Sequence, residues 1–181
     1  MTQVLPMLDY ETASPEVRAA WDGEIAVRGR ITNMKRTFLH SPESFKVMME
    51  FYTVYERLVP VVGKRAVWLF CHAISSGNDC LICSMYFRRN LIDSGVNPSD
   101  YVPTEDEQLL IDFGRMFSHA NPTHKPDPEI WPRIKARFDA VQIVDLTVFG
   151  GLMVANNIFN DFLEVPLDDA LYDYMPDGAQ G

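Results

Sequence analysis

Helix-start signals recur along the chain and restrict its fold more than any other feature. Residues 14–16 and 41–43 both have the sequence Ser-Pro-Glu, which combines a capping side chain, a proline at the first helical position and an acidic first turn. Residues 104–107 and 139–142 have the three-residue spacing of a capping box. No segment alternates apolar and polar residues as a half-buried strand does. The sequence therefore predicts an all-α, single-domain bundle of about seven to eight helices.

Apolar periodicity between these starts predicts where the helices run. The segment at 64–75 is apolar almost all round, which is typical of a helix in the middle of a bundle or in an oligomer interface. Residues 1–13 are expected to form an extended arm, and residues 166–181 a loosely held acidic tail. The expected helices cover about 15–28, 33–39, 42–60, 64–75, 80–94, 105–118, 129–137 and 139–163.

Composition narrows the class of protein. The chain has 181 residues, 47% of them hydrophobic, which suits one domain with a packed core. Its net charge of −9, without a basic cluster, argues against binding of nucleic acid or of anionic lipid surfaces. No cationic leader precedes an apolar stretch, and polar residues interrupt the longest apolar runs, so neither secretion nor a membrane span is expected. Three cysteines do not make a disulfide scaffold. A soluble, cytoplasmic protein is predicted.

Two cysteines, Cys80 and Cys83, form a C-x-x-C motif at an expected helix start. Asp79 is the expected N-cap, and Gly95 suits the left-handed position that ends a helix. Residues three apart share a helix face, so the two sulfurs can meet. The helix N-terminus favours a thiolate, whereas the charge of Asp79 opposes it. The pattern favours redox chemistry, with metal binding and an inert pair as alternatives.

Three segments resemble the carboxymuconolactone decarboxylase and alkylhydroperoxidase D superfamily. They are RGRITNMKRTFLHSPESF at 28–45, the segment 64–95 around the C-x-x-C, and the stretch 105–169 with its late Asn-Asn and closing VPLDD. The resemblance implies a helical fold and a homo-oligomer, either a dimer, a trimer or a hexamer. It also implies reduction of a small-molecule peroxide with an external thiol reductant and without a cofactor or metal. In that scheme Cys83 attacks the peroxide and Cys80 resolves the product, although local electrostatics alone favours Cys80.

The sequence departs from the family pattern where a proton relay is expected. Phe87 stands where the family has histidine after the second cysteine. Trp68, or Ala66 in a shifted frame, stands where it has glutamate. Phenylalanine, tryptophan and alanine side chains cannot act as a general base for the thiol proton. His72 on the preceding helix is the best substitute base, with a structural core histidine as the alternative.

Other residues near the motif are candidates for a substrate pocket. Tyr86 lies one turn beyond Cys83 on the same face, where its hydroxyl is able to donate to a peroxide oxygen. Trp68 and Ser75 precede the motif on the helix expected to pack against it. For all three, packing or turn formation is the competing interpretation. Cys71 is expected to be a small buried hydrophobic residue.

Three other functions stay open at this point. A cysteine-independent lyase or isomerase would use His72 on an acidic lactone, but Arg88 and Arg89 are the only cations near the motif in sequence. A non-catalytic oligomeric protein would keep the fold after losing the relay. A soft metal held by the two cysteines and His72 lacks the fourth ligand of a tetrahedral site. Thiol-dependent peroxide or disulfide reduction is the predicted function.

Overall fold

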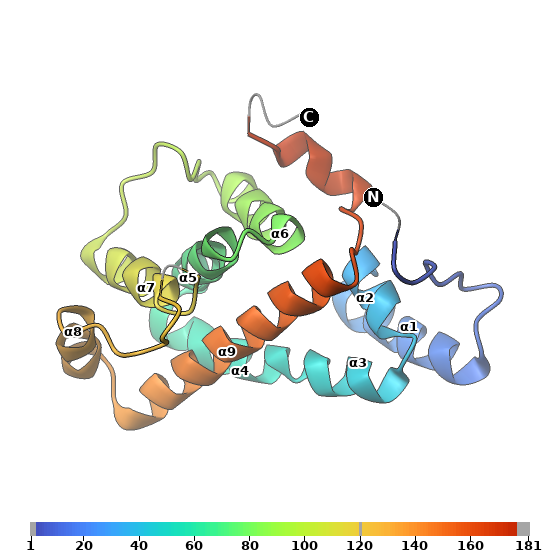
Figure 1. The fold of residues 1–181 in the computed structure, drawn as a ribbon, viewed down its shortest axis with the longest axis horizontal. Helices are drawn as coiled ribbons and strands as arrows, with labels where there is room; N and C mark the ends of the chain where they lie inside the picture. The colour runs from blue at the N-terminus through green and yellow to red at the C-terminus, as the bar shows by residue number, and fades with distance from the viewer. Residues whose placement is uncertain (1–2, 120, 177–181) are drawn as a thin grey trace.

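The computed structural model describes residues 3–119 and 121–176, and over these ranges the chain is helical (Figure 1). It contains nine α-helices and one short 3-10 helix in that part of the chain, with no strand. The all-α prediction is confirmed. The helices are α1 (Pro15–Arg28), α2 (Asn33–Phe38), α3 (Pro42–Met49), α4 (Phe51–Val62), α5 (Lys64–Gly77), α6 (Leu81–Asp93), α7 (Glu105–Arg115), α8 (Ile130–Arg137), α9 (Ala140–Phe162) and the 3-10 helix η1 (Asp169–Tyr174).

Helix starts follow the sequence closely. The Ser14 hydroxyl accepts the Val17 amide hydrogen at the start of α1. Both predicted capping boxes form, at the starts of α7 and α9. Gly29 ends α1 with a left-handed φ of 75°. Local capping chemistry therefore sets most of the element boundaries.

The helix expected over residues 42–60 is two helices, which corrects that prediction and raises the helix count to nine. The chain tightens at Glu50, whose amide bonds the Val47 carbonyl at 3.3 Å. No glycine or proline marks this break in the sequence, and Pro60 lies inside α4. Phe51, directly after the break, stacks on Phe149 of α9 with ring centroids 4.4 Å apart. Long-range packing of α4 on α9 therefore decides a boundary that local sequence does not mark.

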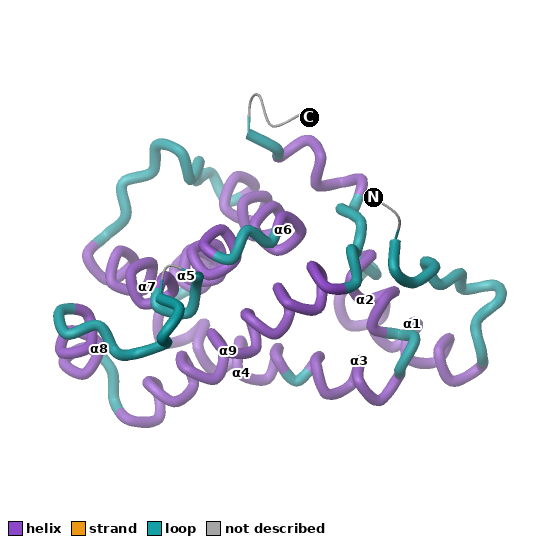
Figure 2. Tube along the Cα trace, in the orientation of Figure 1, coloured by secondary structure: helices purple, strands orange, loops and turns teal. Residues whose placement is uncertain are grey.

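Helix α5 lies at the centre of the larger group of helices, as its apolar composition predicts. It packs against α4, α6, α7 and α9. The ring of Phe70 lies 6.0 Å from that of Phe113 on α7 and 6.3 Å from that of Phe149 on α9. Cys71 is fully buried in the same core, as expected. Figure 2 shows α1–α3 grouped at one end of the molecule and α5–α8 at the other, with α9 running along both.

The C-terminal segment is packed, which corrects the expectation of a loose tail over residues 166–176. Leu167 and Leu171 are buried against α6 together with Val165. The Arg88 side chain donates to the Tyr174 carbonyl at 2.8 Å. The acidic composition of the segment conceals two leucines at helical spacing, and burial of their side chains stabilises its docking. Residues 177–181 of the predicted tail lie outside the described part of the chain.

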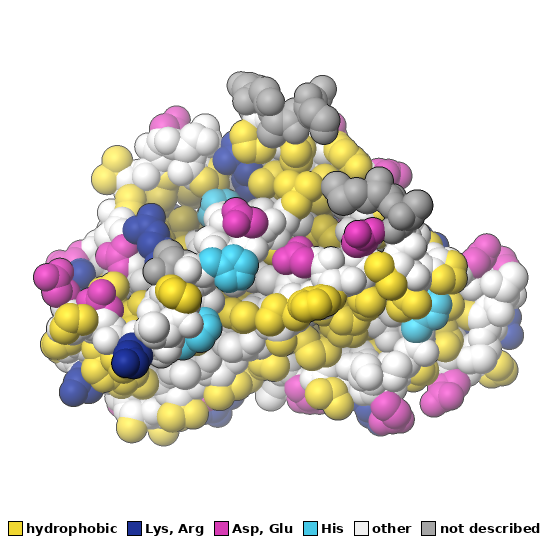
Figure 3. Space-filling view, viewed as in Figure 1, with side chains coloured by type: hydrophobic (Ala, Val, Ile, Leu, Met, Phe, Trp, Pro, Cys, Tyr) yellow, Lys and Arg dark blue, Asp and Glu magenta, His cyan; other side chains and the backbone are white. Residues whose placement is uncertain are grey.

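Helix α9 presents an apolar stripe to solvent. Figure 3 shows a band of hydrophobic atoms across the face where α9 runs in Figure 1. Within the described ranges, α9 is the one helix long and apolar enough to cross a membrane by length and composition. It also buries three asparagines and packs on α4 and α5, as a core helix of a soluble fold does. The predicted homo-oligomer stays a prediction. The exposed residues are Val141, Val144, Val148, Ile158 and Phe162.

Candidate functional site

The turn between α5 and α6 places the two cysteines. Asp79 has a left-handed φ of 58°, and Cys80 takes the N-cap position of α6. The predicted Asp79 cap is therefore wrong by one residue. The Cys80 amide bonds back to the Ser75 carbonyl at 3.0 Å, and this closure requires the left-handed residue before it. At the other end of α6, Gly95 has φ 86°, as predicted.

Cys80 and Cys83 form a buried, reduced pair. A hydrogen bond from the Cys83 thiol lowers the pKa of Cys80, and the Cys83 backbone amide adds to this effect against the opposing effect of burial. The same thiol–thiol hydrogen bond, together with burial, raises the pKa of Cys83 well above its ordinary value. Electrostatics at the helix start therefore favours the negative charge on Cys80, as the sequence suggested.

Side-chain amides surround the second sulfur. Asn160 of α9 donates its Nδ2 to the Cys83 Sγ at 3.2 Å, and Asn157 also bonds this sulfur. Asn157 in turn donates to the Ser75 Oγ at 3.2 Å and accepts from Asn78 at 3.2 Å. Donors of this kind favour a thiolate on Cys83 and partly offset its burial. The predicted pocket residue Ser75 therefore belongs to this buried amide network.

Asp161 connects the dithiol to the surface. Its carboxylate accepts a hydrogen bond from the Cys80 thiol, and its own side chain is exposed. Partial burial raises the pKa of Asp161, while the Cys80 hydrogen bond and the charge of His119 oppose that rise. Hydrogen bonds thus run from Cys83 to Cys80 to Asp161. Sequence reasoning missed Asp161, because it lies 78 residues after Cys83, near the end of α9, and shares no motif with the cysteines.

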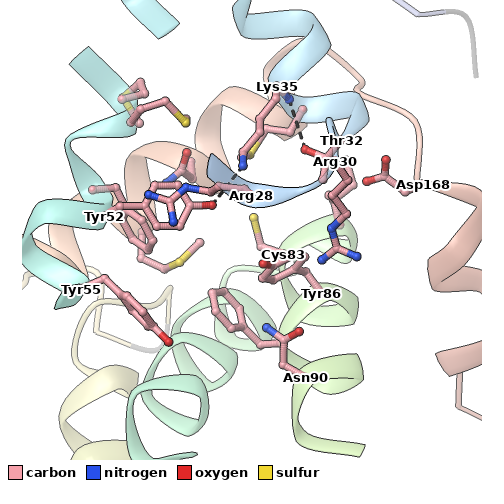
Figure 4. Close-up of a pocket in the computed structure, with 18 of the residues that line it drawn as sticks. Arg28, Arg30, Thr32, Lys35, Tyr52, Tyr55, Cys83, Tyr86, Asn90 and Asp168 are labelled. Atoms are coloured by element: carbon pink, nitrogen blue, oxygen red, sulfur yellow. Dashed lines mark hydrogen bonds between the residues drawn. The ribbon is translucent and has the colours of Figure 1, made fainter. Parts of the chain in front are cut away.

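A cavity of about 380 Å³ opens beside Cys83 (Figure 4). Cys83 belongs to its lining and Cys80 does not. Most of the wall is methionine, aromatic and aliphatic. The lining residues are Val27, Arg28, Arg30, Thr32, Met34, Lys35, Met48, Met49, Phe51, Tyr52, Tyr55, Trp68, Ile82, Cys83, Tyr86, Phe87, Asn90, Met153, Asn156 and Asp168.

Three cations line this cavity, from α1, α2 and the loop between them. Lys35 forms a buried ion pair with Glu24 and lies 3.1 Å from the Tyr52 hydroxyl. The Arg28 guanidinium stacks over the Tyr52 ring at 3.2 Å. Arg30 lies over the Tyr86 ring at 5.6 Å. Only the folded chain brings these cations to the cysteines, so no pattern in the sequence marks a cationic site.

Some of the other predicted site residues line the cavity and others do not. Trp68 and Tyr86 line the cavity, and so does Phe87. His72 is outside the lining, and no hydrogen bond joins it to either sulfur within the described ranges. Burial and the charge of Arg88 lower the pKa of His72 to about 4, so its imidazole is neutral at neutral pH. Over the same ranges, no three His, Cys, Asp or Glu side chains gather as metal ligands would.

Solved structures with similar folds cover nearly the whole chain. A crystal structure described as the alkylhydroperoxidase AhpD core of an uncharacterized peroxidase-related protein from Ralstonia eutropha aligns with a TM-score of 0.67 and 14% identity, over 97% of this chain and 98% of that one. A peroxidase-related protein from Silicibacter gives 0.69 and 14%, over 94% of each. The debrominase Bmp8, as a cysteine-to-alanine variant in complex with 2,3,4-tribromopyrrole, gives 0.70 and 13%, over 96% of each.

No family model and no curated protein matches the sequence. At these identities the structural likeness establishes the fold, and it agrees with the resemblance drawn from the three sequence segments. The chain folds as proteins of this structural class do.

Proposed function

From the alkylhydroperoxidase D-like fold as a premise, we propose that this chain is a thiol-dependent peroxidase in which Cys83 attacks the substrate and Cys80 resolves the product. One observation carries the proposal: the Cys83 sulfur lines a cavity of about 380 Å³ while sharing a hydrogen bond with Cys80. The sulfur that meets a small molecule and the sulfur that can close a disulfide are therefore neighbours.

The first step forms a sulfur–oxygen bond. Cys80 first gives its proton to the Asp161 carboxylate, which passes it to solvent, and becomes a thiolate. The Cys83 proton then moves along its hydrogen bond to the Cys80 thiolate, and the resulting Cys83 thiolate attacks the terminal peroxide oxygen. The O–O bond breaks, Cys83 becomes a sulfenic acid, and the alkoxide takes a proton from water. The amide of Asn160, at 3.2 Å from the sulfur, stabilises the attacking anion.

The second step closes the disulfide. Cys80 gives its proton to the Asp161 carboxylate, which is exposed and can return it to solvent. The Cys80 thiolate then attacks the sulfenic sulfur of Cys83 and releases hydroxide, which is protonated to water. An external dithiol reductant supplies two electrons and two protons to restore the pair. Asp161 thus takes the proton-accepting role for which the sequence offered His72.

Thiol counting with stopped-flow peroxide consumption tests this function. One equivalent of cumene hydroperoxide should remove two thiols per chain and join Cys80 to Cys83 in the mass map. We expect Cys83→Ser to lower the rate by at least about 100-fold. Cys80→Ser should still react once and accumulate a sulfenic acid at Cys83, trapped by dimedone. Unchanged consumption in Cys83→Ser would rule the proposal out.

The cationic lining favours a lyase or isomerase acting on an acidic lactone as the second candidate. Arg28, Arg30 and Lys35 provide the cations that the sequence near the cysteines lacked. This activity would survive alkylation of both thiols, whereas peroxide reduction would not. Turnover of 4-carboxymuconolactone by the alkylated protein would therefore replace the first proposal with the second.

The debrominase neighbour suggests a third use of the fold, since its variant binds a halogenated pyrrole. For this chain, 2,3,4-tribromopyrrole serves as an additional substrate in the same thiol-counting assay. Release of bromide dependent on Cys83 would change the assigned substrate while keeping the attacking residue.

A further inference from the structure

The cavity carries a charge opposite to that of the molecule. The whole chain has a net charge of −9, yet the lining contains Arg28, Arg30 and Lys35 against a single carboxylate, Asp168. A concave surface of one sign with apolar walls concentrates the field and draws ligands of the other sign. The lining therefore favours an organic anion.

The three cations are not equally available to a ligand. Lys35 is paired with Glu24, and Arg28 lies 3.7 Å from the same carboxylate while stacking on Tyr52. Arg30 makes no ion pair within the described ranges, and its exposed side chain reaches the cavity beside Tyr86 and Asp168 (Figure 4). A guanidinium binds a carboxylate through two parallel hydrogen bonds. Arg30 is therefore the lining cation without an ion pair in the described residues, and its charge already acts on the Asp168 carboxylate nearby.

Two buried acceptors without donors lie close to the cavity, one on Asn160, which contacts Cys83 but is outside the lining, and one on the lining residue Asn156. Asn160 uses its Nδ2 on Cys83, and its Oδ1 has no hydrogen-bond partner among the described residues. The Oδ1 of Asn156, a lining residue that is 4% exposed, is also without a partner there. An unsatisfied buried acceptor costs stability, so such a group marks a place where a ligand donor belongs. The O–H of a hydroperoxide is a donor of this kind.

We infer that the substrate is a hydroperoxide with an apolar body and a carboxylate, whose peroxide group lies between Cys83 and the asparagine acceptors and whose carboxylate binds Arg30. This inference rests on the proposed peroxidase function and adds the substrate class to it. The methionine and aromatic wall accepts the apolar body, and the volume of about 380 Å³ suits an aryl acid.

Binding is measured without turnover. The Cys83→Ala variant is titrated calorimetrically with 4-isopropylbenzoate and with its uncharged amide. We expect the carboxylate to bind about ten-fold more tightly than the amide. Arg30→Gln in the same background should remove that preference. Arg133→Gln, the same charge change on α8, should keep it, because α8 contributes nothing to the lining. Equal affinity for acid and amide would overturn the inference.

Kinetics separates failure of the inference from failure of the peroxidase. Cumene hydroperoxide and its 4-carboxy derivative are compared on the wild-type chain, with about ten-fold higher kcat/KM expected for the carboxylate. Arg30→Gln should remove this advantage through KM. Equal rates for both peroxides, unaffected by Arg30→Gln, would leave the peroxidase and refute the carboxylate. A binding preference without consumption of either peroxide would keep the anion site and refute the peroxidase.

Discussion

The starts of α6 and α7 occupy equivalent positions in their helices and carry different chemistry. At α7 the cap is Thr104, and the Glu107 carboxylate accepts bonds from the Thr104 amide at 2.9 Å and the Tyr101 hydroxyl at 2.7 Å. At α6 the cap is Cys80, a weak acceptor as a thiol and a good one as a thiolate. The hydrogen bonds at the start of α7 are fully formed at every pH near neutral. At the start of α6, the Cys80 sulfur becomes a better hydrogen-bond acceptor when its thiol loses a proton.

The difference shows how a helix N-terminus is used for stability or for reactivity. Burial alone would raise the pKa of Glu107, but the hydrogen bonds from Tyr101, Thr104 and Arg65 lower it to about 2. Both oxygens of the Glu107 carboxylate accept hydrogen bonds, so this group has a structural role. Around Cys83 the two asparagine oxygens are left over, and protons can shift between sulfurs. The unpartnered acceptors on α9 beside the start of α6 are the feature on which the proposed chemistry depends.

The largest effect should follow from removing the charge at α7. Glu107→Gln should lower the free energy of unfolding at pH 7 by about 2 kcal/mol, because the hydrogen bonds to this buried carboxylate and its ion pair with the half-exposed Arg65 are weakened. The folded-state pKa lies below the unfolded one, so this stability is present above pH 4.5 and is lost as the pH falls toward 2. Urea unfolding as a function of pH measures both.

The control is Asp106→Asn, one residue away in the same turn. Asp106 is exposed and pairs with Arg137 at the surface, so its loss should change stability by less than about 0.5 kcal/mol. Equal destabilisation by the two variants would show that the completed cap of α7 has no special importance.

The next effect concerns proton removal at α6. Asp161→Asn should slow disulfide formation after peroxide attack by about ten-fold, because Cys80 loses its proton acceptor. The wild-type rate should fall as the pH drops below the raised pKa of Asp161, since only the carboxylate accepts a proton. The variant should lack this limb of the pH profile. Stopped-flow measurement of the dimedone-sensitive intermediate gives the rate.

Asp145→Asn provides the matched variant on α9. Asp145 pairs with Arg57 at the surface, far from the cysteines in the fold, and its substitution should leave the rate unchanged. If Asp145→Asn slowed disulfide formation as much as Asp161→Asn, the effect would come from the negative charge of the surface and not from proton acceptance by Asp161.

A smaller effect should come from the α7 cap itself. Thr104→Ala removes the hydroxyl that accepts the Glu107 amide, at a cost of about 1 kcal/mol in unfolding free energy. Thr104→Ser should restore most of that stability. Thiol oxidation by peroxide should be the same in all three proteins, and a change in it would mean that the two helix starts are coupled.

The smallest effect should come from the turn before Cys80. Asp79 holds a left-handed φ of 58°, which glycine adopts without cost, so Asp79→Gly should stabilise the protein by about 0.5 kcal/mol. Asp79→Asn should stay near zero, because asparagine tolerates this conformation. Thermal unfolding compares the variants. Destabilisation by glycine would mean that the Asp79 side chain itself supports the turn.

Sequence alone predicted what depends on neighbours along the chain. The starts of α1, α3, α7 and α9 follow from short-range caps, and the C-x-x-C marks the reactive pair. The Asp79 cap was wrong because the turn needs a left-handed residue there, a property set by how α5 meets α6. Arg30 and Asp161 were missed because each comes from a segment far from the cysteines in sequence, and one sequence holds no pattern that links such residues.

Contacts between the two ends of the chain hold one wall of the cavity. Asn33 donates its amide to Asp168 at 2.8 Å and its side chain to the carbonyls of Pro166 and Leu167, across 133 to 135 residues of sequence. During synthesis these hydrogen bonds cannot form until residues 166–168 have left the ribosome. A nascent chain therefore carries both cysteines before this wall of the cavity is held in place, so the cavity is completed only at the end of folding.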